Sequence, residues 1–165
     1  MRLKIVSLFA AVLLVAACES TPETTDQTMG TGEVVVEETI VEVTPLDPMS
    51  IEYVQEMYGD HVLFDFDSSV VRPNAEAVVR NWANWMESYP SVVVVIEGRC
   101  DERGTREYNL ALGERRANAV KNLLVALGVD PSRIATISYG KERPVVDGHS
   151  EAAWAQNRRG TLVLG

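Results

Sequence analysis

The chain has 165 residues, of which 46% are hydrophobic, and this size suits one medium domain with additional segments. The formal net charge of −9 is unevenly distributed, because residues 19–60 hold eleven acidic side chains and no lysine or arginine. Residues 61–165 hold thirteen acidic and thirteen basic side chains and are formally neutral. This neutral part lacks the basic stripe that nucleic-acid binding requires, so we expect no nucleic-acid partner.

The first eighteen residues have the pattern of a lipoprotein signal peptide. Arg2 and Lys4 precede an apolar run at 5–17 that is too short to span a bilayer comfortably. The run ends in Val15-Ala16-Ala17-Cys18, which resembles the lipobox of bacterial lipoproteins; an ordinary secretory signal is the alternative. We predict a signal peptide at 1–17 and lipidation of Cys18, since several acyl chains hold a protein stably on a membrane.

Residues 18–48 are predicted to form an acidic, flexible tether behind the lipid. They are rich in Thr, Glu, Gly and Pro and lack aromatic residues, so they cannot bury enough surface to fold alone. Within them, residues 33–44 fit either a strand added to a partner's sheet or a solvated linker. Glu19 follows the cysteine where, in the enterobacterial sorting scheme, an aspartate would retain a lipoprotein at the inner membrane. We therefore expect attachment to the periplasmic face of the outer membrane.

Residues 49–165 have the periodic patterns of one folded domain. Helices are indicated by apolar residues at i, i+3 and i+4, and strands by β-branched runs. In chain order we predict a helix at 50–58, a strand at 61–66, a helix at 73–89, a strand at 92–96, a helix at 106–127, a strand at 134–139, a helix at 151–157 and a strand at 161–164. This order predicts an α/β (α+β) sandwich, a mixed four-stranded sheet with helices packed on it.

Two packing expectations follow from these patterns. The continuous β-branched run at 92–96 suggests a strand that is covered on both faces. In the helix at 106–127 we expect one buried stripe, made of Leu110, Gly113, Ala117, Val120, Leu124 and Leu127.

The sequence does not have the pattern of an enzyme. His61 and His149 are the histidines of the chain, and no pair of His or Cys has the spacing of a zinc site. Asp65 and Asp67 are spaced like an acid–base pair, but no second group of polar residues supports them. We expect no metal, no cofactor and no catalysis, and hydrolysis by paired carboxylates is the weaker alternative.

The densest polar cluster is the loop at 98–105, which follows a strand, a common position for ligands in α/β sheets. In the next helix, Asn109, Leu112 and Arg116 are spaced i, i+3 and i+7 and therefore line one strip. Asp101 in the loop and Arg116 on the strip are placed to bracket a zwitterion. The alternative is that Asp101 pairs with an arginine or caps the helix. The ligand hypothesis requires that the two charges lie close together and are open to solvent.

Five motifs in this part resemble the OmpA C-terminal-like family, and within it the peptidoglycan-associated lipoproteins. The resemblance covers about residues 61–165 with motifs in the same order and spacing. The motifs are Phe64-Asp-Phe-Asp67, Gly98-Arg-Cys-Asp-Glu-Arg-Gly-Thr105, Tyr108-Asn-Leu-Ala-Leu-Gly-Glu-Arg-Arg-Ala-Asn-Ala-Val120, Ile137-Ser-Tyr-Gly-Lys-Glu-Arg-Pro144 and Asn157-Arg-Arg159.

The resemblance implies an OmpA-like domain that binds peptidoglycan at the diaminopimelate of its stem peptide, whose second stereocentre bears an ammonium and a carboxylate. The ligand-binding aspartate and arginine of the family fall on Asp101 and Arg116. Asn109 and Leu112 match residues that line the same site. Phe64 and Asp65 match the residues that close the binding site in the family. Asn157 and Arg158 match a motif of structural character.

The resemblance also implies a non-catalytic lipoprotein that anchors the outer membrane to the cell wall. It would act in the Tol–Pal system, with TolB and other Tol proteins as partners, in envelope integrity and cell division. There are two alternative functions: a wall-binding lipoprotein without Tol partners, and a peptidoglycan hydrolase. One departure concerns Arg99 and Cys100, which stand where the family usually has His and Ala or Thr. Arg99 adds a charge to the loop or pairs with a nearby acid, and Cys100 is expected to be a small buried hydrophobic residue.

Overall fold

The computed structural model describes residues 45–165 of the chain. The predicted signal peptide at 1–17, the lipidated Cys18 and most of the tether, including residues 33–44, lie outside the described residues. The predictions made for these segments therefore stay predictions.

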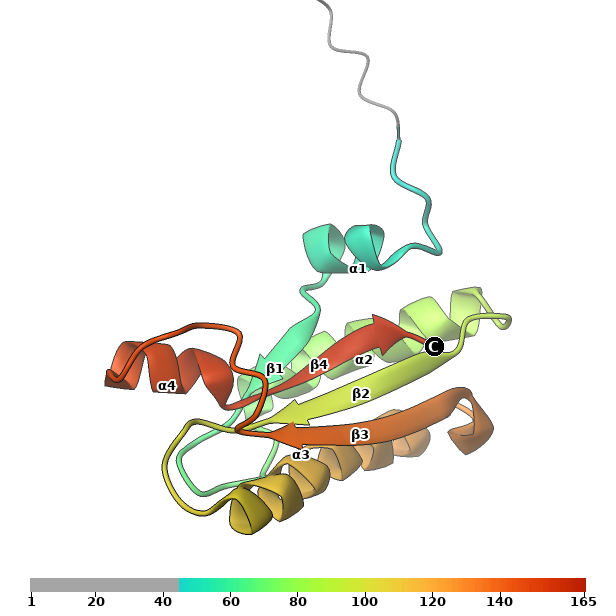
Figure 1. Ribbon diagram of the computed structural model, residues 1–165. Helices are drawn as coiled ribbons and strands as arrows, with labels where there is room; N and C mark the ends of the chain where they lie inside the picture. The colour runs from blue at the N-terminus through green and yellow to red at the C-terminus, as the bar shows by residue number, and fades with distance from the viewer. Residues whose placement is uncertain (1–44) are drawn as a thin grey trace, which may run out of the picture. The chain divides into compact units, whose positions relative to one another are not determined.

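Each helix and strand predicted for the domain is present and in the predicted order, and Figure 1 shows their arrangement. A short 3-10 helix, η1, is added before the third strand. The elements are α1 (Ile51–Met57), β1 (His61–Leu63), α2 (Pro73–Ser88), β2 (Val94–Arg99), α3 (Arg106–Ala126), η1 (Pro131–Arg133), β3 (Ile134–Gly140), α4 (Glu151–Asn157) and β4 (Arg159–Leu164).

The four strands form one mixed sheet in the order β1-β4-β2-β3. Strand β4 pairs antiparallel with β1 on one side and with β2 on the other, whereas β2 and β3 are parallel. Strands β1, β2 and β3 therefore end at the same end of the sheet, where the loops after β1 and β2 meet the start of α3 (Figure 1). The predicted sandwich with a mixed four-stranded sheet is confirmed.

The hydrophobic core lies between the sheet and the two long helices, α2 and α3, which cover one face of it (Figure 1). Each large apolar side chain buried there contributes roughly 1.5–3 kcal/mol. The helices contribute Val79, Trp82, Met86, Val120 and Leu124, and the sheet contributes Val62, Val94, Ile96 and Leu162.

Two tryptophans of α2 form hydrogen bonds to the backbone just before and just after α1. The indole N–H of Trp82 donates to the carbonyl of Gly59 at 2.7 Å, and that of Trp85 donates to the carbonyl of Pro48 at 2.8 Å. Both indoles are thus buried with their single donor satisfied, as buried tryptophans require. The end of the predicted tether is thereby fixed to the helix layer.

Strand β1 is shorter than the predicted range 61–66, because the chain turns after Leu63. The carbonyls of Asp65 and Ser68 accept hydrogen bonds from the Arg116 guanidinium instead of pairing with a strand. In the same turn, Asp67 has a φ of 53°, which is uncommon for a residue other than glycine. The strand therefore ends where the backbone carbonyls begin to accept hydrogen bonds from Arg116 of α3.

The prediction that β2 is covered on both faces is wrong. The strand begins at Val94, and every second residue is buried under the helices while the residues between are half-buried on the other face. On that face, the Arg99 side chain donates to Glu97 at 2.6 Å and to the carbonyl of Arg143 at 2.9 Å. The side chains of the Arg99–Glu97 ion pair therefore lie over this face of the strand, where the sequence suggested full coverage.

Helix α3 approaches β2 at a glycine on each element. A Cβ atom added to Gly98 would lie 1.8 Å from the carbonyl oxygen of Gly113. A Cβ atom on Gly113 would lie 2.4 Å from the Ser138 hydroxyl oxygen. The two backbones are thus in contact with no side chain between them, which draws the start of α3 close to the loop after β2.

The buried stripe of α3 differs from the prediction at both ends. Leu110 is exposed and Leu127, which follows the helix, is half-buried, whereas the predicted residues between them are buried. Asn109, Leu112 and Arg116 are buried as well. The first half of α3 runs under the two loops rather than over the apolar core. Polar side chains are stable there because the loop backbone supplies their hydrogen-bond partners.

Candidate functional site

A cavity of about 160 Å³ lies at the end of the sheet where the loops after β1 and β2 meet α3. Ligands commonly bind at this position in α/β sheets. Its lining comes from three segments: Phe66 and Asp67 from the first loop, Cys100, Asp101, Arg103 and Gly104 from the second, and Tyr108, Asn109, Leu112 and Arg116 from α3.

Arg116 holds the two loops together from below. Its guanidinium donates to the carbonyls of Ser68 at 2.8 Å, Arg99 at 2.9 Å and Asp65 at 3.0 Å. The side chain is completely buried, and burial lowers the pKa of Arg116 from its ordinary value. An arginine nevertheless keeps its charge in proteins, so Arg116 is a fixed positive charge in the cavity wall.

Asp101 is the buried acidic residue of the cavity and is held by two arginines. It accepts from the backbone N–H of Arg103 at 3.1 Å, from Nη2 of Arg103 at 2.7 Å and from Nη1 of Arg158 at 3.2 Å. Burial by itself raises the pKa of Asp101, but the hydrogen bonds from Arg103 and Arg158 outweigh it and keep this pKa below its ordinary value. The carboxylate is therefore charged at neutral pH.

The two charges do not pair with each other. Among the described residues, no hydrogen bond or ion pair links Asp101 to Arg116, although both line the cavity. The expectation that both are open to solvent is wrong, since Asp101 is 4% exposed and Arg116 is 0% exposed. A ligand therefore reaches these two charges only if a side chain of the cavity wall moves. The alternative, in which Asp101 pairs with an arginine, describes the structure as it stands.

Asn109 and Leu112 lie on the predicted strip and face the cavity. The Asn109 amide donates to the carbonyls of Arg103 at 2.8 Å and Thr105 at 3.1 Å, so it fixes the shape of the loop after β2. Leu112 is 5% exposed and provides an apolar wall. The helical spacing thus placed three cavity residues correctly on one face.

Phe64 and Asp65 do not line the cavity. Phe64 is buried, and its ring centroid is 5.3 Å from the guanidinium carbon of Arg116. The Asp65 carboxylate points outward and pairs with Arg72 at 2.8 Å. The turn after β1 brings Phe66 and Asp67 to the cavity instead.

Arg103 is a cavity residue that sequence reasoning missed. Its guanidinium lies 4.1 Å from the centroid of the Phe66 ring and 4.3 Å from that of Trp154. Its Nη1 atom is 3.7 Å from a carboxylate oxygen of Glu151. The sequence gives the charge of this residue, but its ring contacts come from segments far away along the chain.

Arg158 supports the cavity from the side of α4. It is buried and donates to Asp101, to the carbonyl of Phe64 at 3.3 Å and to Glu151 at 2.7 Å. Its neighbour Asn157 binds the backbone of Val145 and Val146. The structural character expected for this motif agrees with these contacts, although Arg158 also holds Asp101 in the cavity wall.

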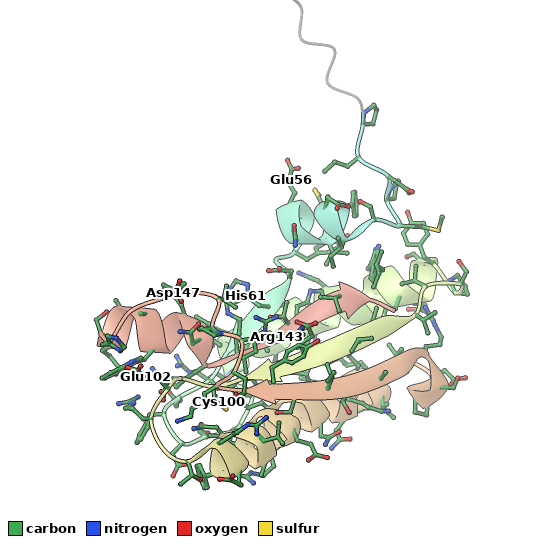
Figure 2. All side chains as sticks on the ribbon, in the orientation of Figure 1. Glu56, His61, Cys100, Glu102, Arg143 and Asp147 are labelled. Carbon is green, nitrogen blue, oxygen red and sulfur yellow. The ribbon has the colours of Figure 1, made fainter. Side chains whose placement is uncertain are left out.

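The structure shows the roles of Arg99 and Cys100, the two residues of the loop that differ from the usual family pattern. Figure 2 shows Cys100 at the end of β2, near Glu102. The Cys100 thiol is buried, donates to the carbonyl of Asn109 at 3.3 Å, and has its pKa raised by burial to about 11. It is a small buried residue, as predicted. Arg99 pairs with Glu97 on the opposite face of the sheet and does not line the cavity.

Within residues 45–165, no three His, Cys, Asp or Glu side chains gather closely enough to hold a metal ion. The same residues contain no helix with the length and apolar character needed to cross a membrane. The two carboxylates that are spaced like an acid–base pair have separate partners: Asp65 binds Arg72, and Asp67 accepts a hydrogen bond from the Tyr108 hydroxyl.

Comparison with known proteins gives consistent matches. The OmpA family matches residues 63–158. A peptidoglycan-associated lipoprotein of Brucella melitensis is 50% identical over 106 residues, which are 64% of this chain and 63% of that protein. One of Pasteurella multocida is 44% identical over 114 residues, which are 69% of this chain and 75% of that protein.

A crystal structure of the peptidoglycan-associated lipoprotein from Burkholderia pseudomallei superimposes with a TM-score of 0.67 at 44% sequence identity. The alignment covers 72% of this chain and 100% of that one. The OmpA match, the fold and the motifs around the cavity agree with one another. The chain belongs to the OmpA family, and its folded part is similar to the peptidoglycan-associated lipoproteins.

Proposed function

We propose that the domain binds peptidoglycan non-covalently, with the diaminopimelate of the stem peptide in the cavity at the loop end of the sheet. The observation that carries this proposal is the cavity lining, which contains the carboxylates of Asp67 and Asp101 and the guanidiniums of Arg103 and Arg116. We assign the ligand's ammonium to Asp101 and its carboxylate to Arg116, the two charges that are buried in the cavity wall. The free end of diaminopimelate has an ammonium and a carboxylate on one carbon. Its two charges complement those of Asp101 and Arg116.

Arg116 retains capacity for a ligand carboxylate. A guanidinium has five N–H donors, and three donor atoms of Arg116 make one hydrogen bond each to loop carbonyls. Two N–H groups, one on each terminal nitrogen, are left for a bidentate contact with a carboxylate. The apolar surfaces of Phe66 and Leu112 line the same space and suit the methylene groups between the two ends of diaminopimelate.

The proposed role of the whole chain is a mechanical link without catalysis. Lipid on Cys18 would fix one end to the periplasmic face of the outer membrane, and the acidic tether would cross to the wall. The wall is a repeating polymer, so many weak attachments hold a membrane more firmly than any single one does. Modest affinity at one cavity is therefore sufficient for anchoring.

We further propose that the protein acts in the Tol–Pal system with TolB as a partner. This part rests on the similarity to peptidoglycan-associated lipoproteins. Co-purification with TolB distinguishes it from a wall-binding lipoprotein without Tol partners. Incubation with purified sacculi tests the hydrolase alternative, which requires the release of soluble muropeptides.

Asp101→Asn is expected to reduce pelleting with purified sacculi at least tenfold. The amide keeps the size of the side chain but lacks the charge that neutralises the ligand's ammonium. The measurement is co-sedimentation with sacculi, at a temperature where circular dichroism shows each variant to be folded. A thermal melt is needed because Arg103 and Arg158 lose their shared counter-ion.

Glu102→Gln is the matched control for this experiment. Glu102 is the next residue in the same loop, and the substitution changes the charge equally, but its carboxylate binds His149 and Trp154 outside the cavity. It should pellet like the unaltered chain. A folded Asp101→Asn variant that pellets equally well contradicts the proposed function.

A further inference from the structure

The Asp101 carboxylate has little hydrogen-bonding capacity left in this structure. A carboxylate has about four acceptor sites, and Asp101 accepts four hydrogen bonds. Three come from the backbone N–H, Nε and Nη2 of Arg103, and one comes from Nη1 of Arg158. The residue is 4% exposed. An incoming ammonium must therefore replace one of these donors.

Of the two arginines, Arg103 is the one that is able to leave. The Arg158 side chain is 7% exposed and also binds Glu151 and the carbonyl of Phe64, so moving it would break its contacts with three partners. The Arg103 side chain is 32% exposed and lines the cavity. Its backbone N–H is able to stay on Asp101 while the guanidinium moves away.

The surroundings of Arg103 already provide a second place for its charge. The guanidinium lies between the rings of Phe66 and Trp154, and both rings attract a cation through their faces. Glu151 places a carboxylate oxygen 3.7 Å from Nη1 of Arg103. None of these contacts depends on Asp101. A small shift of the guanidinium toward Glu151 therefore exchanges one carboxylate for another.

We propose that Arg103 is a cationic gate, which the ligand's ammonium displaces from Asp101. The inference rests on the proposed function and extends it to the way in which the buried cavity opens. The exchange leaves Asp101 with a positive partner before and after binding, so no buried charge is left alone. It also makes the site selective, because a ligand without an ammonium has nothing to offer Asp101 in place of Arg103.

Arg103→Gln is expected to bind free diaminopimelate about tenfold more tightly than the unaltered chain, as measured by isothermal titration calorimetry. Glutamine keeps much of the length of the side chain but has no charge that must be displaced. The full chain carrying Cys18→Ser is used for every variant, so that none is acylated. Arg106→Gln is the matched control, because Arg106 lies three residues on and pairs with Glu142 at 3.5 Å outside the cavity. Its affinity should not change.

Pimelate, the same dicarboxylate without amines, separates gating from a general loosening of the loop. Arg103→Gln should gain affinity for diaminopimelate but none for pimelate. If Arg103→Gln does not fold, Arg103→Lys replaces it. Lysine loses the planar grip on the carboxylate and should give an affinity gain of about threefold.

The outcomes distinguish the gate from the proposed function. If the unaltered chain binds diaminopimelate and the Arg103 variants bind it equally or more weakly, the gate is refuted and the proposed function stands. An equal gain for pimelate refutes the gate as well. If no version of the chain binds diaminopimelate, the proposed function fails, and the gate fails with it.

Discussion

Gly98→Ala is expected to prevent stable folding of the domain. The added methyl carbon would lie 1.8 Å from the carbonyl oxygen and 2.5 Å from the carbonyl carbon of Gly113. These are backbone atoms in the middle of α3, so no side-chain rotation relieves the clash. The helix would have to move away from β2 along its length. Overpacking of this kind costs about 3 kcal/mol or more, a large part of the stability of a domain this size.

Urea denaturation of Gly98→Ala beside Gly160→Ala measures this effect. Gly160 on β4 is the register partner of Gly98, so both substitutions add a methyl group to the same part of the sheet. The Cβ of Gly160 would meet a methyl group of Val120 at 3.3 Å, and that side chain is able to adjust. We expect a loss of about 1 kcal/mol there. Equal losses for the two variants would show that the close approach of α3 and β2 is not rigid.

Arg116→Ala is expected to lower the free energy of unfolding by about 3–5 kcal/mol, because it removes the donor of three hydrogen bonds, to the carbonyls of Asp65, Ser68 and Arg99. Both loops that form the cavity are held by this one side chain. Arg116→Lys keeps the charge but cannot reach three acceptors with a planar fork, so we expect about half of that loss.

Thermal and urea unfolding of the two Arg116 variants test this prediction. A variant Arg116→Ala that melts like the unaltered chain would show that the loops keep their shape without the guanidinium. The expected loss also affects how binding data are interpreted. Reduced wall binding by Arg116→Ala reports the collapse of the cavity as well as the loss of a ligand contact, which is why Asp101→Asn is the sharper test of the ligand.

The sequence predicted the elements well because their signals are local. Ser50, Thr105 and Ser150 each accept a hydrogen bond at the start of a helix. The spacing of Asn109, Leu112 and Arg116 placed these residues on one face of α3, and all three line the cavity. Patterns within one helix depend on geometry that every helix shares, so they are readable without the fold.

The partners of the charged residues were not predictable in the same way. Arg116 bonds to carbonyls 48 and 51 residues earlier in the chain, and Arg158 bonds to a carboxylate 57 residues earlier. Such pairs form only when the loops meet in the folded domain. For this reason the sequence predicted that Asp101 and Arg116 are exposed, whereas the structure buries both. The family resemblance assigned Phe64 and Asp65 to the site, whereas the turn at Asp67 brings Phe66 and Asp67 to the cavity instead.

The central claim is that the cavity recognises an ammonium and a carboxylate carried by one ligand. Sacculi loaded with the protein and then titrated with free diaminopimelate test this claim most directly. Pimelate, with two carboxylates, and cadaverine, with two amines, are the controls that each carry one sign of charge. We predict that diaminopimelate releases the protein and that neither control does so at the same concentration. Protein that stays on the wall at saturating diaminopimelate, or that is released equally by either control, would contradict the claim.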